Sequence, residues 1–221
     1  TQLAADGHHV YVRANSGVAR ADTIVAEIRD AGGAAEAIVF DVSNGPATEA
    51  ALTRLLESGA IQILVNNAGI HDDAVMPGMK REQWSRVIDV SLNGFFNVTQ
   101  PLLLPMIGTR WGRIVNISSV SAVAGNRGQT NYAAAKAGLH GATKSLSLEV
   151  ASRGITVNTV APGVIASPMS GESFTKDIID RLVPMKRAGK PEEVAALVAF
   201  LASDRAAYIS GQLISINGGM I

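Results

Sequence analysis

The sequence predicts an α/β fold, in which helices cover both faces of a doubly wound parallel sheet and give three layers. Short apolar segments alternate with helical patterns along the 221 residues, and this alternation is typical of parallel sheets. Residues 61–65 are continuously apolar, as in strands buried on both faces. Four of the predicted strands end at or beside Asp41, Asn67, Ser119 and Gly163. Ligands bind at the carboxyl ends of the strands in this kind of sheet.

Each element follows from a local pattern. Residues 1–7 have the form of a helix end that Gly7 closes. Strands are predicted where β-branched, aromatic or continuously apolar residues gather, at 8–13, 35–42, 61–65, 111–119, 155–161 and 212–216. Helices are predicted at 18–31, from Pro46, at 80–107, at 128–153 and from Pro191. With no linker, repeat or second core pattern, residues 1–221 are expected to form a single domain.

Composition excludes several functional classes. Nineteen basic side chains balance 19 acidic ones, so the charge supports neither a nucleic-acid surface nor a charged membrane face. The sequence has no cysteine, which excludes disulfides, zinc–thiolate sites and thiol nucleophiles. No apolar run approaches the roughly 18 residues of a membrane span, and no signal peptide opens the chain. We therefore expect a cytoplasmic protein without nucleic-acid or membrane partners.

Tyr132 and Lys136 are the pair from which the chemistry is predicted. They stand four apart in the segment N-Y-A-A-A-K, and the alanines favour a helix that places both on one face. A free tyrosine has a pKa of about 10. A lysine ammonium beside it favours the phenolate and is expected to lower that pKa toward the range of a general acid–base.

Ser119 supplies a third group at the end of a predicted strand. It lies in I-S-S-V-S, thirteen residues before Tyr132, where its hydroxyl is able to hold a substrate oxygen. A Tyr-x-x-x-Lys pair alone is common on helices and usually means a packed ring beside a solvated cation. The serine at a strand end favours the catalytic interpretation over that structural one.

Several ordered motifs resemble the short-chain dehydrogenase/reductase family. The set Ser119, Tyr132 and Lys136 is similar to its catalytic group, the segment N-N-A-G at 66–69 to its N-N-A-G, and A-P-G at 161–163 to its P-G after a later strand. From residue 10 to 221 the chain is similar to the 3-oxoacyl-(acyl-carrier-protein) reductase branch. The resemblance implies a Rossmann-type fold and reduction of a 3-oxoacyl thioester.

The resemblance also implies a role for each catalytic residue. Ser119 would hydrogen-bond the carbonyl oxygen and Tyr132 would protonate the alkoxide, while Lys136 lowers the tyrosine pKa and holds the nicotinamide ribose. Ser91 stands where the family has a catalytic asparagine that holds a water feeding protons to the lysine. A serine is shorter and lacks the amide, so we expect weakened turnover. A main-chain carbonyl can still hold the water.

Three residues near the first predicted strand favour NADPH over NADH. Acidic residues at this place select NAD, whereas a nearby arginine accommodates the 2′-phosphate of NADP. Residues 11–18 contain no acid but include Arg13, Asn15 and Ser16. The alternative for Arg13 is a solvated strand end.

Further cofactor contacts are predicted at later strand ends. The small residues Asn67, Ala68 and Gly69 let the backbone approach a ribose or nicotinamide, although N-N-A-G is also a good turn. The resemblance implies that Asp41 and Val42 line the adenine pocket, where an aspartate is equally an ordinary helix cap. It further implies nicotinamide contacts from a group near the P-G motif: Pro162, Gly163, Ile165 and Ser167.

Other segments are predicted by their composition or by the resemblance. Residues 168–183 would form a substrate lid, since their start is polar and contains Gly and Ser. The loop with His71, Asp72 and Asp73 is interpreted as solvated rather than metal-binding, and His140 as a bystander. The family begins with a strand and a glycine-rich, pyrophosphate-binding turn, neither of which precedes Thr1 here. We therefore expect an incomplete amino terminus and a gap in the middle of the sheet.

The predicted function is NADPH-dependent reduction of 3-oxoacyl-ACP, with acyl carrier protein as partner. The alternatives are reduction or oxidation of another small ketone or alcohol, such as acetoacetyl-CoA, and a cofactor-binding scaffold with little turnover. The family's long helices build a homotetramer, so a homotetramer or homodimer is expected, although the small residues of helix 128–153 fit internal packing equally. Acyl length, carrier and stereochemistry stay open.

Overall fold

The computed structural model describes residues 1–166 and 174–221, in which strands and helices alternate. The strands are β1 (His9–Ala14), β2 (Ala34–Val39), β3 (Ile63–Asn66), β4 (Gly112–Ile117), β5 (Ile155–Pro162) and β6 (Leu213–Ile216). The helices are α1 (Gln2–Ala5), α2 (Val18–Asp30), α3 (Gly45–Leu56), α4 (Arg81–Ile88), α5 (Gly94–Thr109), α6 (Ser121–Ala124), α7 (Thr130–Val150), α8 (Lys176–Leu182) and α9 (Pro191–Ala202). The strand pairings are parallel, which confirms the predicted fold class.

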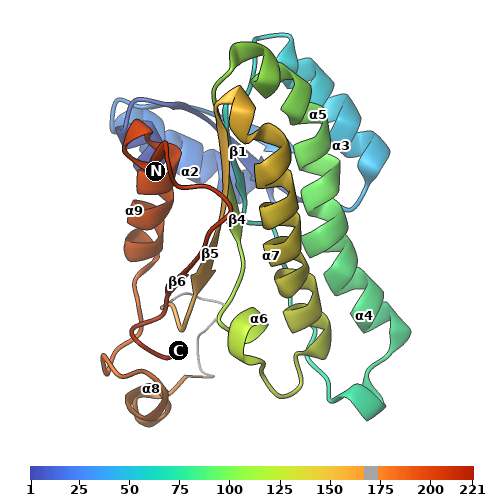
Figure 1. Cartoon of the computed structure of the whole chain (residues 1–221), viewed down its shortest axis with the longest axis vertical. Helices are drawn as coiled ribbons and strands as arrows, with labels where there is room; N and C mark the ends of the chain where they lie inside the picture. Colours follow the sequence, from blue (N-terminus) through green and yellow to red (C-terminus); the bar gives the residue numbers. More distant parts are fainter. Residues whose placement is uncertain (167–173) are drawn as a thin grey trace.

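Helices form a layer on each side of the strands. Figure 1 shows α2 and α9 on one side, and α3, α5 and α7 on the other. The larger core cluster joins β4 and β5 to α5 through fully buried side chains such as Ile114, Leu102 and Met106. A second cluster packs α9 against the opposite face through Leu201 and Val160. This sandwich holds the strand ends at fixed positions for a site.

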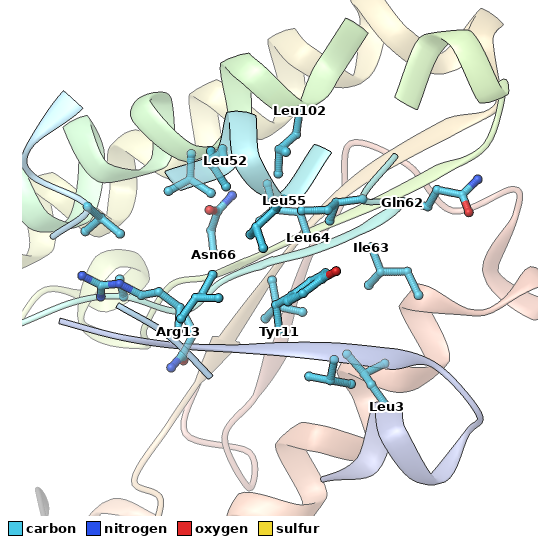
Figure 2. Close-up of a pocket in the computed structure, with 18 of the residues that line it drawn as sticks. Leu3, Tyr11, Arg13, Leu52, Leu55, Gln62, Ile63, Leu64, Asn66 and Leu102 are labelled. Atoms are coloured by element: carbon cyan, nitrogen blue, oxygen red, sulfur yellow. The ribbon is translucent and has the colours of Figure 1, made fainter. Parts of the chain in front are cut away.

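The strands lie in two separate groups. In the described residues, β1 pairs with β2 in one sheet, and β3, β4, β5 and β6 follow in that order in another. A cavity of about 940 Å³ lies between β1 and β3 and is lined by side chains of both strands; Figure 2 shows Tyr11 and Leu64 facing it. The gap that the sequence predicts in the middle of the sheet is present.

Three elements differ from the sequence prediction. The helix expected at 80–107 is divided into α4 and α5 by a π-helical turn, Asp89–Asn93. The strand expected to be buried at 35–42 ends at Val39 and has three exposed residues among its six, because β2 is the outer strand of its pair. The short helix α6, directly after Ser119, was not predicted.

A buried row of polar side chains crosses the sheet beneath the site. Asn66 Nδ2 donates to Asn116 Oδ1 at 2.9 Å, and Asn116 Nδ2 donates to Thr143 Oγ1 at 2.8 Å. The Thr143 hydroxyl in turn lies 2.7 Å from that of Thr159. Buried polar groups must be paired to be tolerated, so this row fixes the register of β3, β4 and β5 relative to α7.

The described residues contain neither a membrane-spanning helix nor a metal-binding cluster. No helix within 1–166 or 174–221 is long and apolar enough to cross a membrane. In the same part of the chain, no three His, Cys, Asp or Glu side chains lie close enough together to hold a metal ion.

Candidate active site

Helix α7 presents Tyr132 and Lys136 on one face, as predicted. Tyr132 lies in its first turn and Lys136 one turn later. The Lys136 Nζ lies 6.0 Å from the centroid of the tyrosine ring. The i, i+4 spacing therefore brings the amine alongside the phenol.

Ser119 joins this pair from the carboxyl end of β4. Its hydroxyl is hydrogen-bonded to the phenolic oxygen of Tyr132, and its Oγ accepts a hydrogen bond from the Ser121 amide at 3.2 Å. The first turn of α6 thus orients the serine toward the tyrosine. The three residues that the sequence singles out meet at one point.

Lys136 is held by backbone carbonyls from two strand ends. Only 2% of the residue is exposed, and Nζ donates to the Ile117 carbonyl at 2.9 Å and the Ala68 carbonyl at 3.5 Å. Burial disfavours the charged form and lowers the pKa of Lys136 to about 8. An ammonium has three N–H donors, so one of them is left for a further acceptor such as a ribose hydroxyl.

The expected lowering of the tyrosine pKa is wrong for this structure. Burial of the ring raises the pKa of Tyr132, and this effect exceeds the opposing effect of the hydrogen bond from Ser119. The phenol is therefore fully protonated at neutral pH. A protonated phenol suits a proton donor better than a proton acceptor.

Asp73 is a site residue that the sequence analysis missed. Its negative charge adds to the raised pKa of Tyr132. Gln129 Nε2 donates to its carboxylate at 2.8 Å, which ties the loop after β3 to the start of α7. With 44% of its side chain exposed, Asp73 lies in a solvated loop, as interpreted, and its charge still acts on Tyr132. The sequence does not indicate that Asp73 affects the pKa of Tyr132, because the two residues are far apart along the chain.

Asn131, which the sequence analysis overlooked, supports the start of α7, and His140 lies further along the same helix. Asn131 is fully buried, donates to the Asp72 and Gln83 carbonyls and accepts from the Tyr132 amide at 2.8 Å. His140 Nε2 lies 2.7 Å from Ser118 Oγ. Burial, together with Lys144, lowers the pKa of His140, and the ring is neutral at pH 7.

The position of the Lys136 amine requires a residue without a side chain at position 69. A Cβ at Gly69 would lie 2.8 Å from Lys136 Nζ, closer than ordinary contacts. The small residues of N-N-A-G were expected to admit a cofactor, and the structure shows that they also admit the amine. A side chain here would move Lys136.

Ser91 lies beside Gly69 and Lys136. Its Oγ is 3.6 Å from the position of a Cβ at Gly69, on the side of the lysine. The residue is 3% exposed, and its Oγ has no hydrogen-bond partner within the described residues. It belongs to the π-helical turn, a deformation that is frequent at functional sites.

The residues expected at the adenine end of the cofactor gather at the ends of β1 and β2. Arg13 Nε donates to the Phe40 carbonyl at 2.8 Å, and its Nη2 donates to Asn15 at 3.2 Å. The guanidinium is also stacked over the Phe40 ring, so Arg13 is not a solvated strand end. Ser16 is exposed beside Asn15.

The Asp41 carboxylate stabilises the turn before α3 and is not the helix cap that the sequence left open, since the N-cap of α3 is Asn44. Its carboxylate accepts from the Ser43 amide at 2.9 Å and the Ser43 hydroxyl at 2.8 Å, and these bonds lower the pKa of Asp41. Val42 is buried, and its carbonyl accepts from Asn97 at 2.8 Å. This turn places both residues beside α5.

The residues expected near the nicotinamide follow β5. The Pro162 carbonyl accepts from the Val120 amide at 2.8 Å, and a Cβ at Gly163 would lie 2.7 Å from that of Asn217. Ile165 bridges to Gly189. Ser167 and the first part of the expected lid lie outside the described residues, whereas the later part forms α8.

The residues present fit a nicotinamide cofactor at two places. The free donor of Lys136 and the partly buried phenol of Tyr132 suit the ribose end, and Arg13 with Asn15 suits the adenine end. Asn67, Ala68 and Gly69 lie between them at the end of β3.

Comparisons with known proteins point to one family. A family model described as enoyl-(acyl carrier protein) reductase matches residues 1–221. A 3-oxoacyl-[acyl-carrier-protein] reductase of Synechocystis sp. is 45% identical over 221 residues, covering 99% of this chain and 89% of the relative. FabG of Thermotoga maritima, a 3-oxoacyl-[acyl-carrier-protein] reductase, is 45% identical over 204 residues, covering 90% of this chain and 82% of that one.

A solved structure is also closely similar. The crystal structure of a candidate gluconate dehydrogenase from Agrobacterium tumefaciens superposes with a TM-score of 0.94 at 32% identity, covering 99% of this chain and 88% of that chain.

Proposed function

Since the chain belongs to the short-chain dehydrogenase/reductase family and is an NAD(P)-dependent oxidoreductase acting on CH–OH groups, we propose that it reduces 3-oxoacyl-ACP to the 3-hydroxyacyl thioester with NADPH. This is a step of fatty acid biosynthesis. The observation that carries the proposal is the hydrogen bond between Ser119 and the protonated phenol of Tyr132, beside the buried amine of Lys136.

The chain's own residues supply binding and proton transfer. Ser119 donates a hydrogen bond to the ketone oxygen and holds it beside the phenol. Bound NADPH supplies the hydride for the carbonyl carbon. As negative charge grows on the oxygen, Tyr132 transfers its proton to it and becomes a phenolate. The Lys136 ammonium, which is mostly charged at pH 7 because its pKa is about 8, stabilises that phenolate.

Ser91 is proposed to line the route by which the proton is replaced. Its buried hydroxyl has no partner in the described residues and shares the space over Gly69 with the Lys136 amine. A water between the two would satisfy the orphaned hydroxyl, since buried polar groups are rarely left unpaired. Serine reaches less far than asparagine, so this relay is slow.

NADPH is proposed over NADH because of Arg13. The guanidinium is held at the end of β1 by Phe40 and Asn15, and no acidic residue occurs between 11 and 18. An arginine at this place accommodates a 2′-phosphate. Asn15 and Ser16 offer further donors to that phosphate.

A homotetramer or homodimer is proposed from apolar side chains on two helices. Phe96 and Leu104 of α5 are 63% and 77% exposed, and Leu148 of α7 is 84% exposed. Exposed apolar groups on neighbouring helices are typical of subunit contacts. Light scattering should give a mass above the 23.0 kDa of one chain.

The reaction is tested by following cofactor absorbance with four substrate pairs. We expect NADPH oxidation with acetoacetyl-ACP to be faster than with acetoacetyl-CoA, and NADH to be slower than NADPH. Gluconate with NADP⁺ tests the sugar-acid alternative, which the similarity to the candidate gluconate dehydrogenase favours. Faster turnover of gluconate would overturn the proposed substrate, and tight NADPH binding with no turnover of any pair would indicate a scaffold.

A further inference from the structure

Helix α7 lies against β4 and β5 (Figure 1) and contacts the end of β4 through a polar face. Side chains at i, i+4 and i+7 share one side of a helix, and on α7 these include Lys136, His140 and Thr143. Thr143 accepts a hydrogen bond from Asn116 at 2.8 Å, and the Lys136 amine donates one to the Ile117 carbonyl at 2.9 Å. Two consecutive residues of β4 are thus bound to this face of the helix.

His140 extends these contacts by one residue beyond the strand. Its Nε2 lies 2.7 Å from the Ser118 hydroxyl oxygen, and the same hydroxyl donates to the Lys136 carbonyl at 3.1 Å. A serine hydroxyl has a single proton. Because Ser118 gives that proton to the carbonyl, the proton between the two side chains is on Nε2, and the imidazole is the donor.

Ser118 is buried between two groups of the proton-transfer site. Only 4% of the residue is exposed, and its amide donates to the Val160 carbonyl at 2.8 Å. Its neighbours along the chain are Ile117, whose carbonyl holds the Lys136 amine, and Ser119, whose hydroxyl is bonded to the tyrosine phenol. Planar peptide bonds join the three residues, so a displacement of Ser118 moves the carbonyl and the catalytic hydroxyl together.

Two hydrogen bonds from α7 fix the Ser118 side chain more firmly than one. The Lys136 carbonyl is an anchor in the helix backbone, and the imidazole of His140 supplies a second anchor from one helical turn later. Burial and the charge of Lys144 lower the pKa of His140, so the ring is neutral at pH 7. The second anchor therefore requires no buried charge, which would be costly at this place.

We infer that His140 is a positioning residue for the proton-transfer site and that it acts through Ser118. Its hydrogen bond holds the end of β4 against α7, and this sets the positions of the Ser119 hydroxyl and the Ile117 carbonyl relative to the Lys136 amine. The inference rests on the proposed function for its kinetic readout, whereas the contacts themselves involve no substrate.

The kinetic test compares His140→Leu with His140→Gln in the reduction of acetoacetyl-ACP by NADPH. Leucine has a similar volume but removes the donor, so kcat should fall by several-fold, up to about tenfold, as for the loss of one net hydrogen bond. Glutamine carries an N–H donor at a similar reach and does not titrate, so it should restore kcat. Both variants should keep the KM and the NADPH dissociation constant of the wild type, because the imidazole positions groups that act in the transition state.

Two further variants locate the effect. Ser118→Ala should lower kcat at least as much as His140→Leu, and the double variant should be no slower than Ser118→Ala alone, since both substitutions remove the same interaction. His9→Leu is the matched control, because it makes the same substitution at a half-exposed histidine of β1 and should leave kcat unchanged. If His140→Leu fails to fold, Ser118→Ala provides the comparison with the wild type.

Amide hydrogen exchange gives a readout that needs no substrate. His140→Leu should speed exchange at Ser118 and Ser121, whose amides bind the Val160 carbonyl and the Ser119 hydroxyl, and His140→Gln should not. If the wild type reduces none of the substrates, the proposed function fails and the exchange rates alone decide the inference. Unchanged exchange at these two amides, or equal kcat in the leucine and glutamine variants, would overturn it.

Discussion

The two halves of the molecule differ in how completely they are packed. Around β4, β5 and α7, almost every strand residue is buried, and polar side chains pair across the sheet. Around β1 and β2, most strand residues are partly or fully exposed, and a cavity separates them from β3. The first half holds the proton-transfer groups among buried, paired side chains, whereas the second half, with Arg13, is separated from β3 by the cavity.

The largest effect that this comparison predicts comes from Tyr132→Phe in the well-packed half. Loss of the proton donor should lower kcat by about 10²- to 10⁴-fold, while the dissociation constant for NADPH stays nearly unchanged. The assay is cofactor absorbance with acetoacetyl-ACP. Tyr208→Phe, at a fully exposed tyrosine, is the matched control, and full activity in Tyr132→Phe would remove the tyrosine from the mechanism.

Gly69→Ala should disturb the same half by crowding the amine. The new Cβ would meet Lys136 Nζ at 2.8 Å, and overpacking of this kind costs about 1 to 3 kcal/mol. Denaturant unfolding should show the loss, together with reduced kcat. Gly78→Ala, where a Cβ meets nothing within 4 Å, should be neutral or slightly stabilising. Equal stability of the two variants would contradict the close approach.

The buried amine of Lys136 should make stability depend on pH. Its folded pKa of about 8 lies below the ordinary lysine pKa of 10.5, so the unfolded chain binds the proton more tightly between these values. Stability should therefore rise as pH rises, by roughly 1.5 kcal/mol between pH 8 and pH 9.5. The Lys136→Met variant should lack this rise, and Lys144→Met, at an exposed position of α7, should keep it. A wild-type stability that falls over this window would show that the amine is not buried.

Ser91→Asn should raise kcat several-fold, because the longer side chain with its amide completes the proposed relay to Lys136. Steady-state rates at saturating substrate measure the change. Ser152→Asn, at an exposed serine, serves as the control for the substitution itself. An unchanged kcat in Ser91→Asn would mean that the side chain at position 91 does not affect turnover.

Asp73→Asn should shift the pH profile of reduction, which is the smallest effect expected. The Asp73 charge raises the pKa of Tyr132, and reduction needs the protonated phenol. Without that charge, the decline of kcat at high pH should begin at a lower pH. Asp72→Asn, whose carboxylate instead binds Arg86, should leave the profile in place, and a shift toward higher pH in Asp73→Asn would contradict the assignment.

Within the well-packed half, the sequence predicts some features of the site and misses others. Ser119, Tyr132 and Lys136 were found because strand ends and i, i+4 spacing fix their positions through short-range rules. The contacts of Asn131 and the effect of Asp73 on the pKa of Tyr132 were missed because they depend on segments far apart in the sequence. The raised pKa of Tyr132 was missed because desolvation depends on how the whole site is packed.

The most direct test of the contrast between the two halves is amide hydrogen exchange on the chain alone. Exchange rates depend on local opening and on which amides lack partners. The account predicts slow exchange throughout β4 and β5, and faster exchange at alternate amides of β1 and β3, whose donors face the cavity. Equal protection in all four strands would show that the cavity is closed in solution and would contradict the account.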